Sequence, residues 1–240
     1  MEHTNPMERF LKPTAILDYK DAGIRKLVER RGWLGLDNNG KILQIYNFVR
    51  DEITFGYNED DAIPASAVLA DGYGQCNTKG VLFMALLRAA GIPCRMHGFT
   101  IDKKLQKGAM KGFYYRLSPP EILHSWVEVY VEEQSRWINM EGFILDLPYL
   151  SKLQRKFSDC TGSFCGYGVA VADFRNPPVQ WEGNDTYIQK EGIVRDFGVF
   201  DGPDELFAAQ QQGLGPVKRC LFRYVIRHLM NRNVRRIRNG

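Results

Sequence analysis

A cysteine stands at the start of a predicted helix in the sequence Gly72-Tyr-Gly-Gln-Cys76. The apolar residues after it recur at helical spacing, and Gly91-Ile-Pro93 supplies the glycine and proline that end a helix. The first N–H groups of a helix have no intrahelical partner and lie at its positive dipole end, and both effects favour a thiolate over a thiol. The sequence therefore predicts that Cys76 is a nucleophile. The alternative is a small buried side chain in a helix cap, which is the ordinary place of a free cysteine.

The residues just before Cys76 could complete a site for acyl transfer. Gly74 has no side chain, so the backbone there can approach a substrate closely. The N–H of Cys76 is placed to stabilise an oxyanion, and Gln75 could add a side-chain donor. We therefore expect Gly74 and Gln75 to take part in oxyanion or substrate binding.

A predicted β-hairpin supplies the other two groups. Residues 124–141 read as two strands joined by a polar turn, because side chains alternate between apolar and polar along both halves. If Val131 pairs with Gln134 across this turn, the apolar side chains of both strands face the core. His124 then falls directly opposite Glu141.

An imidazole between a thiol and a carboxylate can perform nucleophilic catalysis. The imidazole takes the proton of the thiol, and the carboxylate holds its tautomer and stabilises the imidazolium. The sequence thus predicts Cys76 as nucleophile, His124 as base and Glu141 as the residue that orients His124. In the structural alternative, His124 is a hydrogen-bonded core histidine and Glu141 a solvated residue before a glycine turn.

The elements that must position these residues follow from apolar periodicity and turn residues. Helices are predicted at 18–31, from 42 to near 51, after Cys76, and at 217–230, where the last is basic. Strands are predicted at 53–57, 94–101, 124–131 and 136–141, and residues 58–74 are predicted to form a surface loop. We expect an α+β fold in which the helix that carries Cys76 packs on a mostly antiparallel sheet.

These motifs resemble the transglutaminase-like superfamily of papain-related cysteine enzymes, in particular its bacterial domain proteins. The resemblance runs from about Leu43 to Leu147 and begins with a helix. It rests on five motifs: Phe55-Gly-Tyr57, Gly72-Tyr-Gly-Gln-Cys76, the helix end Leu87-Arg-Ala-Ala-Gly-Ile-Pro93, His124-Ser-Trp126-Val-Glu128, and Trp137 four residues before Glu141. It implies a papain-like fold and an acyl-enzyme intermediate. The motif residues Tyr57 and Trp126 are expected beside the substrate.

One position departs from the family pattern. Family members usually carry aspartate followed by proline where this chain has Glu141-Gly142. Glutamate is one methylene longer and can still accept a hydrogen bond from an imidazole, so a triad can persist. Asn139 or Asp146 could fill the role instead.

Composition limits the classes of function. Five cysteines are an odd number in a chain with no apolar run suited to a signal peptide or membrane span, so we expect free thiols and a cytoplasmic protein. Cys160 and Cys165 lack the further cysteine or histidine pair that a zinc site needs. Neither a metal nor another cofactor is expected.

The net charge of +4 hides an asymmetry. Residues 215–240 carry eight Lys or Arg and no acid, which leaves −4 (+4 minus 8) on residues 1–214 and argues against a nucleic-acid-binding core. We expect residues 1–147 to form the catalytic core with N-terminal helices, and residues 148–240 to form an extension that packs on it, within one domain overall.

The extension ends in a basic amphipathic helix. Its apolar residues are Leu221, Phe222, Val225, Ile226 and Leu229. We expect this stripe to dock on the chain's own domain, although it could also bind an anionic membrane or a protein partner. The arginines from Arg232 to Arg238 are expected to face solvent.

Together these features predict a cysteine enzyme that attacks an amide, ester or thioester carbonyl and forms an acyl-enzyme. Hydrolysis of a peptide or amide bond is the favoured outcome, with a peptide, protein or small amide or ester as substrate. Two alternatives remain: transfer of the acyl group to an amine, as in a transglutaminase, and a non-catalytic binding module that retains the fold. The oligomeric state is left open by the sequence.

Overall fold

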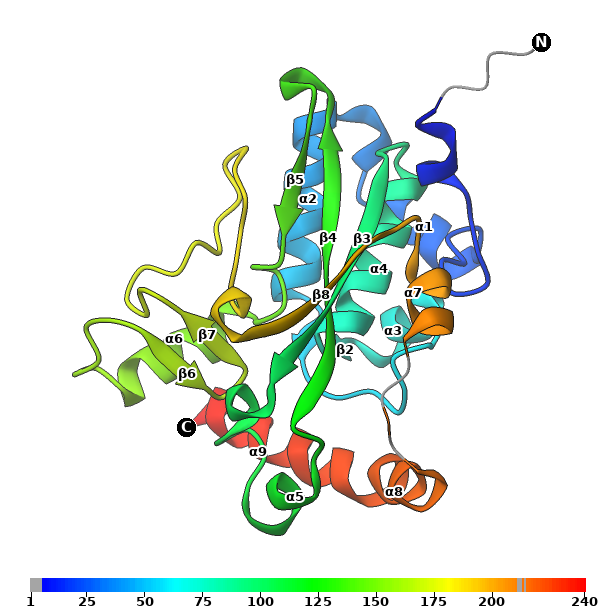
Figure 1. The fold of residues 1–240 in the computed structure, drawn as a ribbon. Helices are drawn as coiled ribbons and strands as arrows, with labels where there is room; N and C mark the ends of the chain where they lie inside the picture. Colours follow the sequence, from blue (N-terminus) through cyan, green and yellow to red (C-terminus); the bar gives the residue numbers. More distant parts are fainter. Residues whose placement is uncertain (1–5, 211–212, 214) are drawn as a thin grey trace.

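A layer of helices packs on one face of a four-stranded sheet (Figure 1). The structure, a computed structural model, describes residues 6–210, 213 and 215–240. Its α-helices are α1 (Ala22–Arg30), α2 (Asn38–Asp51), α3 (Ala65–Asp71), α4 (Cys76–Ala89), α5 (Gly112–Leu117), α6 (Leu147–Lys156), α7 (Pro203–Ala209), α8 (Pro216–Leu221) and α9 (Arg227–Asn239). Its strands are β1 (Thr54–Phe55), β2 (Tyr73–Gly74), β3 (Cys94–Asp102), β4 (Glu121–Val131), β5 (Arg136–Met140), β6 (Phe164–Gly166), β7 (Val169–Val171) and β8 (Ile193–Phe200).

The main sheet has the strand order β5-β4-β3-β8, and each neighbouring pair is antiparallel. Helix α4 contacts β3 and β4 on one face, and almost every residue of this helix is buried. Because nearly all of its side chains are buried, the polar Lys79 and Arg88 included, α4 lies in the centre of the core. The predicted α+β architecture, with the Cys76 helix on an antiparallel sheet, is confirmed.

The hairpin of β4 and β5 forms, but its predicted register is wrong. Val131 pairs with Arg136 and Val127 with Met140, so the ladder is shifted by two residues from the predicted pairing of Val131 with Gln134. A short 3-10 turn that ends with Ser135 in the left-handed conformation makes the loop longer than expected. A shift of two residues keeps every side chain on its predicted face, because strand side chains alternate with period two.

The segment 58–74, predicted as a surface loop, contains helix α3. Pro64 precedes the first turn, and Gly72, with a φ of 68°, follows the last. Proline before a helix and a left-handed glycine after it are boundary signals of a helix. In the sequence they resembled loop residues because the helix between them is only seven residues long.

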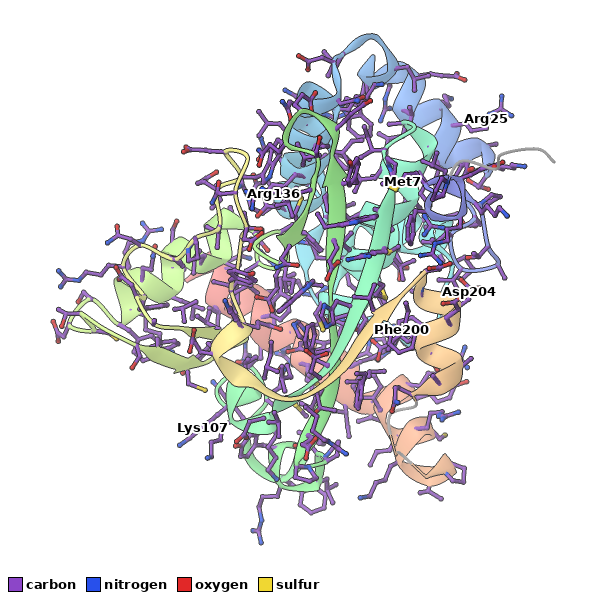
Figure 2. The ribbon with its side chains drawn as sticks, turned by 45° about the horizontal axis from the view of Figure 1, so that its top comes forward. Met7, Arg25, Lys107, Arg136, Phe200 and Asp204 are labelled. Carbon is purple, nitrogen blue, oxygen red and sulfur yellow. The ribbon has the colours of Figure 1, made fainter. Side chains whose placement is uncertain are left out.

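Strand β8 was not predicted from the sequence, and it joins the extension to the sheet beside β3. In Figure 2, Phe200 is labelled at the end of β8 and Asp204 in the helix α7 that follows. Asp204 accepts hydrogen bonds from the Thr14 hydroxyl and from the backbone N–H of Ile16. The N-terminal segment and the extension are therefore joined on this side of the molecule.

The C-terminal helical segment extends from Pro216 to Asn239, and a π-helical turn (Phe222–Ile226) joins α8 to α9 (Figure 1). It docks on the chain's own core through Ile226, Met230 and Val234, whereas Val225 and Leu229 of the predicted stripe are about 40% exposed. Arg238 does not face solvent as expected, because its guanidinium binds the buried Asp146 carboxylate at 2.7 Å.

Candidate active site

Cys76 is the first residue of α4, as the sequence indicates, and its side chain is 8% exposed. The backbone N–H of the preceding Gln75 donates to the Thr78 hydroxyl at 3.0 Å, which ties the first turn of the helix to the chain before it. A side chain at Gly74 would lie 2.7 Å from the same hydroxyl. Only glycine fits there, so the backbone lies close against the helix start and fixes the position of Cys76.

His124 on β4 and Glu141 just after β5 are in contact. Nε2 of the imidazole lies 2.6 Å from Oε1 of the carboxylate, and both side chains are fully buried. In the observed register Glu141 is not paired across from His124, because β5 ends at Met140 and the chain then turns toward the imidazole. The extra methylene of glutamate contributes to the reach of its carboxylate.

The second oxygen of Glu141 is held by the extension. Oε2 accepts the backbone N–H groups of Ile188 at 2.8 Å and Gln189 at 2.9 Å. The backbone N–H of Glu141 in turn donates to the carbonyl oxygen of Thr186 at 3.0 Å. These residues were missed from the sequence, because backbone donors leave no residue-type signal and lie more than forty positions away.

The environment of His124 favours the imidazolium. Burial alone lowers the pKa of His124, but negative charge at Cys76, together with the charge and hydrogen bond of the Glu141 carboxylate, outweighs burial and raises it to about 10. Nε2 is bonded to Glu141, so Nδ1 is the nitrogen left for Cys76. Nδ1 is buried and has no hydrogen-bond partner among the described residues, so it is available to the thiol. Thiol, imidazole and carboxylate are thus arranged in the order that proton transfer requires.

The Gln75 amide is engaged by its neighbours. Its Oε1 accepts the backbone N–H of Asn58 at 2.8 Å, and its Nε2 donates to the Asp61 carboxylate at 3.0 Å. Burial raises the pKa of Asp61, although hydrogen bonds from Gln75 and Asn77 oppose the rise. The side chain of Gln75 therefore supports the loop before α4, and the backbone N–H of Cys76 is the better-placed donor for an oxyanion.

The two aromatic residues expected beside the substrate have different positions. Tyr57 lines the same cavity as Cys76, and its hydroxyl donates to Gln106 at 2.5 Å. Trp126 is not among the described residues that line this cavity. It packs instead against Phe99 of β3, with 4.1 Å between the ring centroids, and the Phe99 ring in turn lies 6.4 Å from that of His124.

The two other residues that could have oriented His124 are committed elsewhere. Asn139 donates from its side chain to the Tyr187 hydroxyl at 2.9 Å. Asp146 binds Arg238 and accepts the backbone N–H of Phe55 at 2.8 Å. Of the three candidates, Glu141 is the one on the imidazole.

A cavity of about 370 Å³ opens beside Cys76. Tyr57, Met110, Leu123 and the C-terminal residues Phe222 and Ile226 contribute to its walls. A concave, mostly apolar cavity of this kind is typical of a ligand site.

Within residues 6–210, 213 and 215–240, no group of three or more His, Cys, Asp or Glu side chains is arranged to hold a metal ion. Cys160 is half-buried and Cys165 exposed, and both are free thiols. In the same described part of the chain, no helix is both long enough and apolar enough to span a bilayer.

Comparison with known proteins agrees with the motifs. Residues 33–142 match the family model of the transglutaminase-like superfamily. An uncharacterized protein, YebA of Bacillus subtilis (strain 168), is 30% identical over 97 residues, which are 40% of this chain and 13% of that protein. This chain therefore matches only a small part of the length of its curated relative.

Two solved structures are similar in part. A putative cysteine protease from Cytophaga hutchinsonii has a TM-score of 0.45 and 15% identity, and the match covers 83% of this chain and 48% of the other. Red sea bream transglutaminase has a TM-score of 0.28 and 18% identity, over 42% of this chain and 21% of the other. Residues 33–142, which carry Cys76, His124 and Glu141, are thus similar to the transglutaminase-like superfamily by the family model.

Proposed function

We propose that this chain is an acyl-transfer enzyme with Cys76 as nucleophile, His124 as general acid and base, and Glu141 as the residue that orients the imidazole. The observation that carries the proposal is the fully buried contact of His124 Nε2 with Glu141 Oε1, together with the effect of the Cys76 thiolate on the imidazole. A buried carboxylate that binds one ring nitrogen leaves the other free to exchange a proton with the thiol.

In the first half of the proposed reaction, the Cys76 thiolate attacks a carbonyl carbon and a C–S bond forms. The electron pair of the carbonyl moves to oxygen, where the N–H of Cys76 at the start of α4 stabilises the charge. The protonated His124 then gives its proton to the leaving group, the bond to that group breaks, and an acyl-enzyme remains.

In the second half, His124 removes a proton from the acyl acceptor as the acceptor attacks the thioester. The C–S bond breaks, the thiolate leaves, and the imidazolium is regenerated. With water as acceptor the enzyme hydrolyses a peptide or amide, which is the outcome we favour. With an amine as acceptor it forms a new amide, and the same residues would serve both reactions.

The experiment that tests this proposal compares the full chain with its Cys76→Ala variant on a library of short peptides and activated esters. Products are identified by mass spectrometry with and without a primary amine such as glycine ethyl ester. We expect free acid as the main product, an amine adduct as a minor one, and neither with Cys76→Ala. Unchanged turnover by Cys76→Ala would refute the catalytic role of Cys76.

The same variant distinguishes catalysis from the alternative of a non-catalytic binding module. If Cys76→Ala loses all turnover and the cellular role of the protein is lost with it, catalysis is the function. If the cellular role persists in the absence of turnover, the fold serves binding alone.

A further inference from the structure

One wall of the Cys76 cavity comes from outside the superfamily match. The match ends at residue 142, whereas Leu221, Phe222, Ile226 and Met230 of the C-terminal helical segment line the cavity. Ile226 and Met230 are nearly fully buried, at 7% and 4% exposed. Their position is fixed by specific bonds, because the Asn231 amide pairs with both the backbone N–H of Tyr57, at 2.7 Å, and its carbonyl oxygen, at 2.9 Å.

A second set of lining residues is also apolar. Met110, Tyr114, Leu117, Ile122 and Leu123 line it, from the segment around α5 and from the beginning of β4. Figure 1 shows α5 at the same end of the molecule as α8 and α9. Apolar side chains from these two regions line one cavity with the Cys76 thiol, and such a cavity, called the slot below, is suited to an apolar group.

The polar side chains inside the cavity already have hydrogen-bond partners within the protein. The Tyr57 hydroxyl donates to Gln106, and Gln75 is bonded to Asn58 and Asp61. The Asn77 amide donates to the carbonyl oxygen of Leu123 at 3.1 Å and accepts from the Ser125 hydroxyl at 2.9 Å. Of the charged lining residues, Asp60, Lys218 and Arg219 are exposed and so belong to the rim. The half-buried Glu59 and Asp61 are bound by Arg223 and by the Gln75 amide. The interior thus offers apolar surface to a ligand.

We propose that the acyl group transferred to Cys76 carries an aliphatic chain of medium length. This chain would lie in the slot, in contact with Phe222 and Ile226 of the C-terminal helical segment and with the apolar residues around α5. This inference rests on the proposed function, since it assumes that Cys76 is acylated. At about 30 Å³ for a group the size of a water molecule, a cavity of about 370 Å³ has room for roughly a dozen non-hydrogen atoms. An octanoyl group fits within that limit.

The test measures kcat/KM of the full chain with p-nitrophenyl acetate, butyrate, hexanoate and octanoate. Burying one methylene is worth about a fourfold change in an equilibrium, so we expect kcat/KM to rise about threefold to fourfold for each added methylene up to octanoate. Ile226→Trp, which fills the slot, should lower the octanoate-to-acetate ratio of kcat/KM about tenfold or more. Val225→Trp is the matched control, because Val225 is the exposed neighbour on the same segment and should leave the ratio unchanged.

A ratio near one in the unmodified chain, or a ratio that Ile226→Trp leaves unchanged, would overturn this inference while leaving the nucleophile in place. Binding of free octanoate to Cys76→Ala, measured by calorimetry, tests the slot without any catalytic step. We expect octanoate to bind and the added Ile226→Trp change to abolish binding. If octanoate binds but Cys76→Ala turns over the esters as fast as the unmodified chain, the slot stands and the proposed function fails. Absence of octanoate binding contradicts the slot.

Discussion

Nε2 of His124 and Oε1 of Glu141 are 2.6 Å apart, with both side chains fully buried, and the other oxygen of Glu141 is held by two backbone N–H groups. A carboxylate fixed at both oxygens cannot rotate away from the imidazole. Glu141 is therefore a rigid support for the orientation of His124.

Replacing Glu141 by glutamine should lower kcat about a thousandfold. The amide can turn its NH2 group toward Nε2 and so hold the wrong imidazole tautomer, and it has no charge to stabilise the imidazolium. Glu141→Asp should retain more activity, since it keeps the charge but shortens the reach. Steady-state kinetics on an activated ester measure the effect, with Glu133→Gln on the exposed hairpin turn as control. Full activity of Glu141→Gln would exclude the orienting role.

The pH profile should report the same contact. In the unmodified chain His124 keeps its proton up to a pKa of about 10, so kcat/KM should fall only as the pH rises past that value. Without the carboxylate the pKa of His124 is lower, and the alkaline limb of the Glu141→Gln profile should move to lower pH. An alkaline limb that stays in place in the variant would show that Glu141 does not act on the imidazole.

Arg238 should contribute to stability through Asp146. The carboxylate is 1% exposed and the guanidinium side chain 15% exposed, and breaking a buried pair by removing one partner typically costs about 3 kcal/mol. Arg238→Met should lower the free energy of unfolding by about that amount in urea denaturation at pH 7. Arg236→Met, at an exposed position of the same helix, is the control and should have little effect.

The loss in free energy of unfolding caused by Arg238→Met should depend on pH in a defined direction. Burial raises the pKa of Asp146, but hydrogen bonds and charge from Arg238 outweigh burial and lower it. A carboxyl with a lowered pKa stabilises the fold above its unfolded-state pKa and loses that contribution as the pH falls through the folded-state value. The difference between Arg238→Met and the unmodified chain should therefore vanish in strong acid, and a difference that persists there would assign it to packing.

Lys79, in the first turn of α4, should make stability rise with pH. Burial lowers its pKa to about 7, against the opposing charges of Asp146 and Asp51, and Nζ donates to the carbonyl oxygens of Arg50 and Ile144. Between about 7 and the unfolded-state pKa of about 10.4, the unfolded chain binds a proton that the folded chain does not. The free energy of unfolding therefore gains up to about 1.4 kcal/mol per pH unit in this window.

Urea denaturation from pH 7 to 10 measures that gain. Lys79→Met should lack it, whereas Lys26→Met, at an exposed position on α1, should retain it. Equal slopes for Lys79→Met and the unmodified chain would mean that Lys79 is not the group responsible.

Several features of the site could be predicted because they are local. The position of Cys76 at a helix start depends on the residues that flank it, and the faces of β4 and β5 depend only on alternation. The register was wrong because it depends on the turn, where Ser135 adopts a left-handed conformation that its residue type does not signal. His124 still meets Glu141, since the chain bends toward the imidazole after Met140.

The features that were missed depend on contacts between distant segments. Ile188 and Gln189 hold Glu141 through backbone N–H groups, which every residue type other than proline possesses. Ile226 faces the cavity whereas Val225 is exposed, although both belong to one apolar stripe in the sequence. The choice between them is set by the docking of Asn231 on Tyr57, which no local pattern encodes.

Acylation by p-nitrophenyl acetate, quenched in acid and mapped by peptide mass spectrometry, tests the central claim most directly. Cys165 and Cys220 are exposed, whereas Cys76 is 8% exposed, so access alone favours the other two. If His124 activates the thiol, the acetyl group should appear first on Cys76, and His124→Ala should abolish this preference. Acetyl groups that appear first on Cys165 or Cys220, with Cys76 unmodified while ester is turned over, would contradict the account.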